Sequence, residues 1–236
     1  MVEKNLNNFL SEYQPQLIEI KKVILRSVVS FLIGATAGLI YNRKIILGLI
    51  SLFDVKNVNI VLTSPYQFVN LAFGIAIISG LVATFPVFIY HFLRFIRPAL
   101  KPHEYILFKK LIPVSIFLFL FGCFFGAKIE QFIVSLYSQT TTDFAVSNFW
   151  DIEKFLSQIV FMSFAMGIVF QLPVVLTILI RLKVLTHAAV SRQRRYIYVG
   201  LTLFGVILPP TDIISLAMII TPLFLLFEGT LLLNRQ

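Results

Sequence analysis

The chain has 236 residues, of which 58% are hydrophobic and only 13% are charged. A soluble domain of this length needs a more polar surface, so the composition excludes a soluble enzyme and indicates an integral membrane protein. The net charge of +9 is better explained by basic loops that contact anionic lipid than by binding to nucleic acid. Most of the chain is apolar, so it has no extensive polar surface to which a nucleic acid could bind. The single cysteine, Cys123, excludes an intramolecular disulfide and paired-cysteine metal sites.

Six apolar stretches approach the roughly 20 residues that a helix needs to cross a hydrocarbon core of about 30 Å. They predict one all-α membrane domain over residues 1–236, with spans over residues 23–41, 69–93, 106–125, 155–180, 196–208 and 213–233. We expect the fifth and sixth spans to be short. The fifth reaches only about 20 Å, so its arginines would snorkel or the bilayer would thin. Pro86, Pro113 and Pro173 lie within spans and favour a kinked, concave bundle, with ordinary helix packing as the alternative.

The distribution of basic residues predicts the orientation. Six crossings put both termini on one side, and that side receives most of the 20 lysines and arginines. The other side keeps Arg43, Lys44, Lys56, Lys128 and Lys154. Both termini are therefore predicted to be cytoplasmic, with long outer loops over residues 42–68 and 126–154. No cleavable leader is visible, which favours a bacterial or organelle-encoded protein.

Two carboxylates stand among the predicted cytoplasmic bases: Glu19 in QLIEIKK and Glu104 in RPALKPHEY. A carboxylate at a half-dry interface accepts a guanidinium through two parallel hydrogen bonds, which suits recognition of an arginine-bearing peptide. The alternative is intramolecular. Glu19 could pair with Lys22 three residues on, and Glu104 could occupy a helix N-terminus.

The predicted spans contain few polar residues, of which Gln171 is the clearest buried one. No proton relay, metal-ligand spacing, phosphate loop or catalytic constellation is recognisable, so we expect neither enzyme activity nor a cofactor. A secondary transporter for a small solute remains the alternative function, and an intramembrane enzyme is a weaker one. Pro65 and the run Pro209, Pro210, Thr211, Asp212 are interpreted as turns, with Asp212 capping the last span.

Several segments, taken in order, resemble one family. QLIEIKK is similar to its HLxELRxR start, and PVFIYHFLRFIRPALKPHE is similar to a segment that ends at a glutamate, here Glu104. LFGCFFG, FQLPVV, RRYIYVG, PPTD and ITPLFLLFE follow in the same order. The chain therefore resembles TatC, the multi-spanning receptor subunit of the twin-arginine protein translocase.

The resemblance implies a glove-like bundle that binds the Arg-Arg signal peptides of folded precursors at the cytoplasmic face of the bacterial inner membrane or, in an organelle, the thylakoid membrane. Glu19, Glu104, Phe95 and Lys21 match its signal-peptide site. It also implies single-span TatA/TatB-type partner subunits, homo-oligomers within a receptor complex, and transport driven by the proton-motive force.

The sequence departs from the family at three places. Gln16 replaces a usual histidine, the turn reads Pro-Pro-Thr-Asp, and Gln171 replaces a buried glutamate of many members. Gln171, Pro173 and Met166 are expected to contact a partner helix, for which a neutral amide can still form a hydrogen bond.

Overall fold

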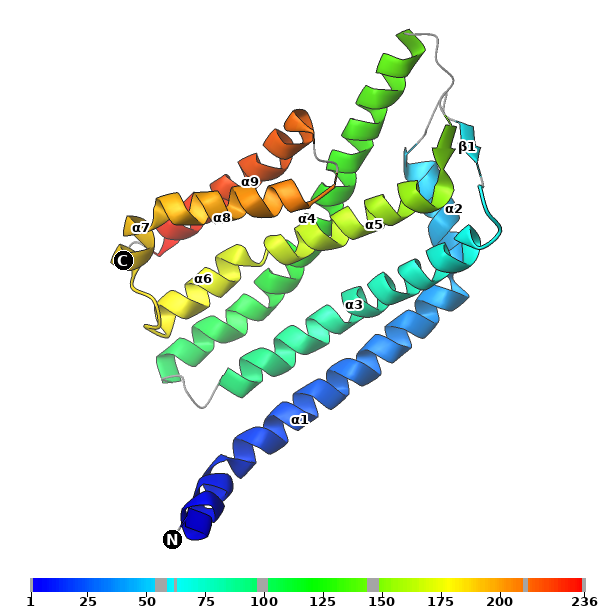
Figure 1. Ribbon diagram of the computed structural model, residues 1–236. Helices are drawn as coiled ribbons and strands as arrows, with labels where there is room; N and C mark the ends of the chain where they lie inside the picture. Colours follow the sequence, from blue (N-terminus) through cyan, green and yellow to red (C-terminus); the bar gives the residue numbers. More distant parts are fainter. Residues whose placement is uncertain are drawn as a thin grey trace.

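A computed structural model describes residues 2–53, 59–61, 63–96, 102–143, 149–209 and 212–234. These residues form a helical protein with one small pair of strands (Figure 1). The helices are α1 (Val2–Ile40), α2 (Asn42–Phe53), α3 (Gln67–Ile96), α4 (Pro102–Asp143), α5 (Ile152–Val169), α6 (Leu172–Arg181), α7 (His187–Arg192), α8 (Arg194–Ile207) and α9 (Ile213–Leu233). The strands are β1 (Asn59–Val61) and β2 (Phe149–Asp151), which pair in parallel with Ile60 opposite Trp150.

Five stretches of the described residues are long and apolar enough to cross a membrane. They are Ile18–Ile40, Gln67–Phe92, Lys109–Ser138, Ile152–Arg181 and Ile213–Leu233. The sixth predicted span corresponds to α9, whose 21 residues reach about 31 Å, so the expectation that it is short is wrong. The fifth corresponds to α8, whose 14 residues reach only about 21 Å. The six-span count therefore depends on α8 and stays a prediction, as does the glove-like curvature.

The outward surface of the long helices is apolar. Only 11% of the apolar window of α1 is buried inside the protein. Leu32, Ile33 and Ile40 are 57%, 67% and 71% exposed. An apolar surface of this extent is unstable in water and is matched by lipid, which supports a membrane environment.

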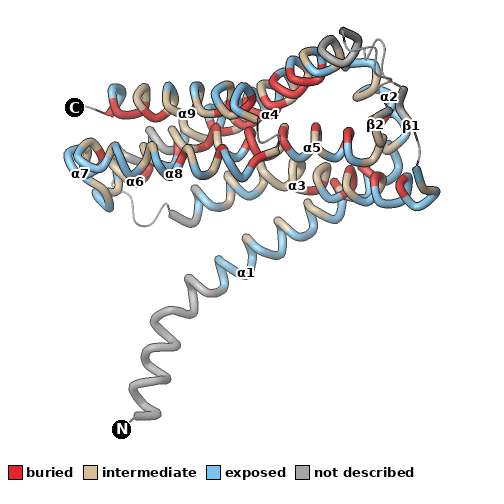
Figure 2. The backbone as a smooth tube through the Cα atoms, turned by 45° about the horizontal axis from the view of Figure 1, so that its top comes forward, coloured by how far each residue is buried: buried red, intermediate tan, exposed pale blue. Residues whose placement is uncertain are grey.

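Most helices lie beside a neighbour in the chain, but α3 packs more on α5 than on α4. α1 lies beside α3, α3 packs on α5, α4 lies along α5, and α8 and α9 form a hairpin on α4 and α6 (Figures 1 and 2). The start of α1, the end of α3, the start of α4 and the end of α9 lie toward one end of the bundle, and α2, β1 and β2 lie at the other (Figure 1). We call these the terminal end and the strand end.

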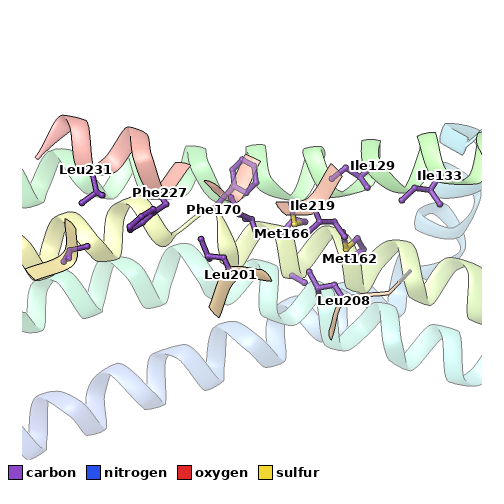
Figure 3. Close-up of a cluster of buried hydrophobic side chains, with 13 residues drawn as sticks. Ile129, Ile133, Met162, Met166, Phe170, Leu201, Leu208, Ile219, Phe227 and Leu231 are labelled. Carbon is purple, nitrogen blue, oxygen red and sulfur yellow. The ribbon is translucent and has the colours of Figure 1, made fainter. Parts of the chain in front are cut away.

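Two clusters of buried side chains hold this arrangement together. The larger joins α4, α5, α7, α8 and α9, and includes Met162, Met166, Ile219 and Phe227, all fully buried (Figure 3). The smaller joins α2, α3, α4 and α5 near the strand end, around Leu71, Leu156 and Ile159. The C-terminal hairpin thus packs mainly on α4, α5 and α6 rather than on α1 or α3.

Both predicted outer loops contain regular structure. Residues 42–53 form α2, and α4 continues eighteen residues beyond Phe125 to Asp143. The prediction of loops here is wrong because it followed the fall in hydropathy, whereas a helix continues wherever its backbone hydrogen bonds and packing allow. Buried Ile129, Ile133 and Val134 supply that packing.

The fourth predicted span is divided into α5 and α6. Helix α5 ends at Val169 and α6 begins at Leu172, with Pro173 in its first turn. Proline lacks an amide donor, and its ring clashes with the carbonyl four residues earlier, here that of Val169. The helix therefore ends at Val169, the residue whose carbonyl Pro173 cannot bond. By contrast, α3 and α4 remain helical through Pro86 and Pro113.

Candidate functional site

The terminal end of the bundle holds a small pocket between α1 and α3. Its volume is about 150 Å³, and Glu19 lies on its α1 side. The lining side chains are Glu19, Lys22, Val23, Arg26, His91 and Arg94. Glu19 is exposed, so its carboxylate is accessible to a ligand that approaches this end.

The pocket is closed by a contact between the two helices. Arg26 Nη1 lies 3.3 Å from His91 Nδ1. Arginine has no acceptor, so His91 must accept with Nδ1 and carry its proton on Nε2. Within the described part of the chain, Glu19 and Lys22 form no ion pair, and the ion pair present joins Arg194 and Glu228. Glu19 is thus held in a basic surrounding without a bound cation of its own.

The other predicted signal-peptide residues lie nearby in the fold. Glu104 falls in the first turn of α4, and Phe95 in the last turn of α3 rather than in a loop. The side chains of both lie outside the described residues. Lys21 is exposed on α1, but Lys22, not Lys21, lines the pocket. Glu19 and Glu104 therefore lie toward the same end of the bundle, on helices that flank α3.

Gln171 lies at the break between α5 and α6 and is buried. Its Oε1 accepts from Ser115 Oγ at 2.5 Å, and its Nε2 donates to Ser115 O at 3.1 Å and to Gly167 O at 3.5 Å. The amide thus bridges α4 to the end of α5 within this chain. Met166 is fully buried and Pro173 half-buried, so a partner helix would reach Met166 only if these helices separated.

A second polar cluster joins α8 to α9. The Tyr198 hydroxyl donates to Glu228 Oε1, and Arg194 Nη1 lies 3.3 Å from Glu228 Oε2. Glu228 is visible in the sequence as a polar residue of the last span, but its partners are not. Arg194 and Tyr198 are four residues apart and so share one face of α8, and this spacing is the signal that could have predicted them as partners of Glu228.

A buried carboxylate in α4 was not foreseen. Glu130 is 1% exposed, and its oxygens lie 3.2 and 3.4 Å from Gln158 Nε2 on α5. Glu130 falls within residues 126–154, which were predicted to be an outer loop, so its burial was missed. Reading the apolar run AKIEQFIVSLY as a continuation of the helix would have revealed it.

The predicted turns are observed where the structure describes them. Pro65 lies in the turn before α3, and Pro209 lies between α8 and α9, whereas Pro210 lies outside the described residues. Asp212 caps α9, accepting from Ser215 N at 2.9 Å, as predicted. Burial raises the pKa of Asp212, but hydrogen bonds from Ser215 outweigh it and hold the pKa below its usual value.

Asp151 links the strand end to α3. It accepts from Thr63 Oγ1 at 2.8 Å and Gln67 Nε2 at 2.5 Å, and it caps α5 through the Glu153 and Lys154 amides. Hydrogen bonds led by that from the Lys154 amide lower the pKa of Asp151. Asp151 therefore ties two predicted outer loops together as an anion.

These polar groups offer binding rather than catalysis. Glu19 supplies a carboxylate at the terminal end of the bundle, where Glu104 lies in the first turn of α4, whereas Gln171 and Glu228 join helices to one another. Within the described residues, no three His, Cys, Asp or Glu side chains are grouped to hold a metal ion. The exposed Glu19 carboxylate at the terminal end can accept a guanidinium through two parallel hydrogen bonds.

Comparison with known proteins identifies a family. A family model described as Sec-independent protein translocase protein (TatC) matches residues 15–222. Sec-independent protein translocase protein TatCy of Bacillus subtilis is 30% identical over 224 residues, covering 93% of this chain and 87% of that protein. The TatC protein of Aquifex aeolicus is 28% identical over 226 residues, covering 93% and 92%.

Two solved structures have a fold similar to that of this chain. The crystal structure of a twin arginine translocase receptor, TatC, superposes with a TM-score of 0.81 at 26% identity, covering 93% of this chain and 98% of that one. The structure of such a receptor in the detergent DDM gives a TM-score of 0.82, covering 94% and 100%. The similarity thus extends through nearly the whole of both chains.

Proposed function

The chain belongs to the TatC family of Sec-independent protein translocase proteins, and we propose that it is the receptor of its translocase for Arg-Arg signal peptides. Membership makes it a multi-pass membrane component of a protein transport system rather than an enzyme. We propose, beyond family membership, that it binds the signal peptide, that named residues form the binding site and that it recruits partner subunits.

The observation that carries the proposal is the position of the two carboxylates. Glu19 lies exposed in the pocket between α1 and α3, and Glu104 lies in the first turn of α4, the helix that follows α3. Two carboxylates toward one end of the bundle match two guanidinium groups in a peptide, since each pair forms parallel charge-assisted hydrogen bonds. Lysine cannot form that geometry, which explains a requirement for arginine. Phe95 in the last turn of α3 and Lys21 midway along α1 would complete the site.

The apolar part of the signal peptide and the single-span partners would lie against the exposed helix faces. Candidates are on α8 and α9, where Leu203, Ile207 and Leu225 are 59%, 77% and 69% exposed. Partner contacts at Gln171, Pro173 and Met166 require α5 and α6 to move from α4, since Gln171 is bonded to Ser115. The protein would form homo-oligomers within a complex that also contains TatA/TatB-type subunits. The complex would lie in the bacterial inner membrane or in the thylakoid membrane of an organelle. Transport would be driven by the proton-motive force.

A peptide titration tests the receptor role. A fluorescent Arg-Arg signal peptide is titrated onto the protein in lipid nanodiscs, and the same is done with Glu19→Gln and Glu104→Gln. We expect each substitution to weaken binding by roughly tenfold, because a charge-assisted hydrogen-bonded pair contributes about 1.5–3 kcal/mol. Glu153→Gln removes the same charge at the strand end and should bind as the unmodified protein does. Full affinity in Glu104→Gln would refute its assigned role.

A further inference from the structure

The pocket around Glu19 contains more positive charge than Glu19 balances. Lys22 and Arg26 lie one turn apart on α1, and Arg94 lies one turn from His91 on α3. Three cations and a histidine N–H thus line a pocket whose lining includes one carboxylate, Glu19. The Arg26 contact to His91 leaves the Nε2–H of the ring as a further donor.

We propose that this pocket binds the phosphate of an anionic membrane phospholipid. A phosphate offers several acceptor oxygens, and Lys22, Arg26, Arg94 and His91 Nε2–H supply donors from both helices. Basic pockets between membrane helices have this capacity where they meet the headgroup region. The bound phosphate balances the cations that adjoin Glu19, and so keeps Glu19 free to accept an arginine.

The surroundings favour a lipid over free phosphate. Phe88 and Tyr90 on α3 are 42% and 47% exposed. Val23 lines the pocket, and on α3 the Tyr90 ring lies 5.2 Å from the ring of the lining His91, with Phe88 one turn before His91. A phosphate held there therefore has apolar surface beside it for acyl chains. A soluble phosphate would gain nothing from that surface.

Native mass spectrometry of the delipidated protein in mild detergent tests this. The protein is titrated with dioleoyl phosphatidylglycerol, with zwitterionic dioleoyl phosphatidylcholine, and with inorganic phosphate. The variants are Arg94→Gln and the pair Lys22→Gln/Arg94→Gln. The control pair Lys109→Gln/Lys110→Gln removes equal charge from exposed positions on α4. Melting without lipid checks that every variant is folded.

We expect tight retention of one phosphatidylglycerol by the unmodified protein and by the control pair. Retention should fall roughly fivefold in Arg94→Gln and thirtyfold in the double variant. Equal retention in all variants would overturn the site, and phosphate binding as strong as lipid binding would overturn the lipid assignment. The assay contains no signal peptide, so its failure would leave the receptor proposal standing.

Discussion

Among single residues, Gln171 forms a structural bridge between helices. Its carboxamide both accepts from and donates to Ser115 across the α5–α6 break. A carboxylate could not donate to the Ser115 carbonyl, and it would be costly to bury. The neutral side chain therefore suits a tight contact between α4 and α5, and it also donates to Gly167 O, whose usual helical donor, Gln171 N, binds Ile168 O instead.

Gln171→Leu is expected to lower the free energy of unfolding by about 1–3 kcal/mol, because the hydroxyl and carbonyl of Ser115 lose their partner in a buried site. Thermal melting in detergent measures this. Gln193→Leu is the control, since Gln193 is exposed and its side chain makes no capping bond. A melting midpoint of Gln171→Leu equal to that of the control would show that the bridge contributes nothing.

The site residues differ in how far the sequence reveals them. Glu19 and Glu104 could be selected because carboxylates are rare among the predicted cytoplasmic bases. Arg26 and His91 could not, since they are 65 residues apart in sequence and meet only through the packing of α1 on α3. Ser115 was missed for the same reason: its partner Gln171 is 56 residues away.

At the scale of elements, α1 and α3 approach closely at small residues. A Cβ on Gly34 would lie 2.6 Å from Ala83 Cβ, and one on Gly38 would lie 2.8 Å from Ser79 Cβ and 3.0 Å from Ala76 Cα. Glycines four residues apart let helix backbones approach in a membrane, where packing rather than the hydrophobic effect drives association. This contact sets the geometry of the pocket that contains Glu19.

We predict that Gly38→Ala destabilises the protein by about 1–3 kcal/mol through overpacking. Gly74→Ala is the matched control on α3, because no heavy atom lies within 4 Å of its added Cβ. That substitution should be neutral or stabilise by up to about 1 kcal/mol through helix propensity. Melting of both variants in detergent compares them, and equal midpoints would contradict close packing at Gly38.

The stability of the strand end is expected to depend on pH through Asp151. The pKa of Asp151 is lowered in the folded protein, led by the Lys154 amide hydrogen bond and that from Thr63. Its stabilisation is therefore complete above the unfolded pKa of about 3.9 and is lost as the pH falls through the lower folded value. The melting midpoint of the unmodified protein should exceed that of Asp151→Asn at pH 6, and the gap should shrink below pH 4. A constant gap would exclude Asp151 as the titrating group.

The elements were partly predictable from the sequence. Long apolar runs located α1, α3, α4, α5 with α6, and α9, because a hydrocarbon core selects for length and apolarity. The helices of the outer segments and the pairing of β1 with β2 were not predictable in this way. They depend on contacts between distant segments, such as Gln131 Nε2 with Leu52 O at 2.9 Å.

At the scale of the whole molecule, the open question of topology is whether α8 crosses the bilayer. Val184, before α7, is 65% exposed and Ile213, at the start of α9, is 86% exposed. In a Cys123→Ala background, an impermeant maleimide should label Val184→Cys from the cytoplasmic side and Ile213→Cys from the opposite side. Labelling of both from one side would reduce the protein to five spans.

Recognition of paired arginines by Glu19 and Glu104 can be tested by photo-crosslinking. An Arg-Arg signal peptide with a photo-reactive group, and its Lys-Lys twin, are crosslinked to the membrane-embedded protein and to its Glu19→Gln/Glu104→Gln variant. We expect adducts only where both the arginines and the carboxylates are present. Equal labelling in all four combinations would contradict it.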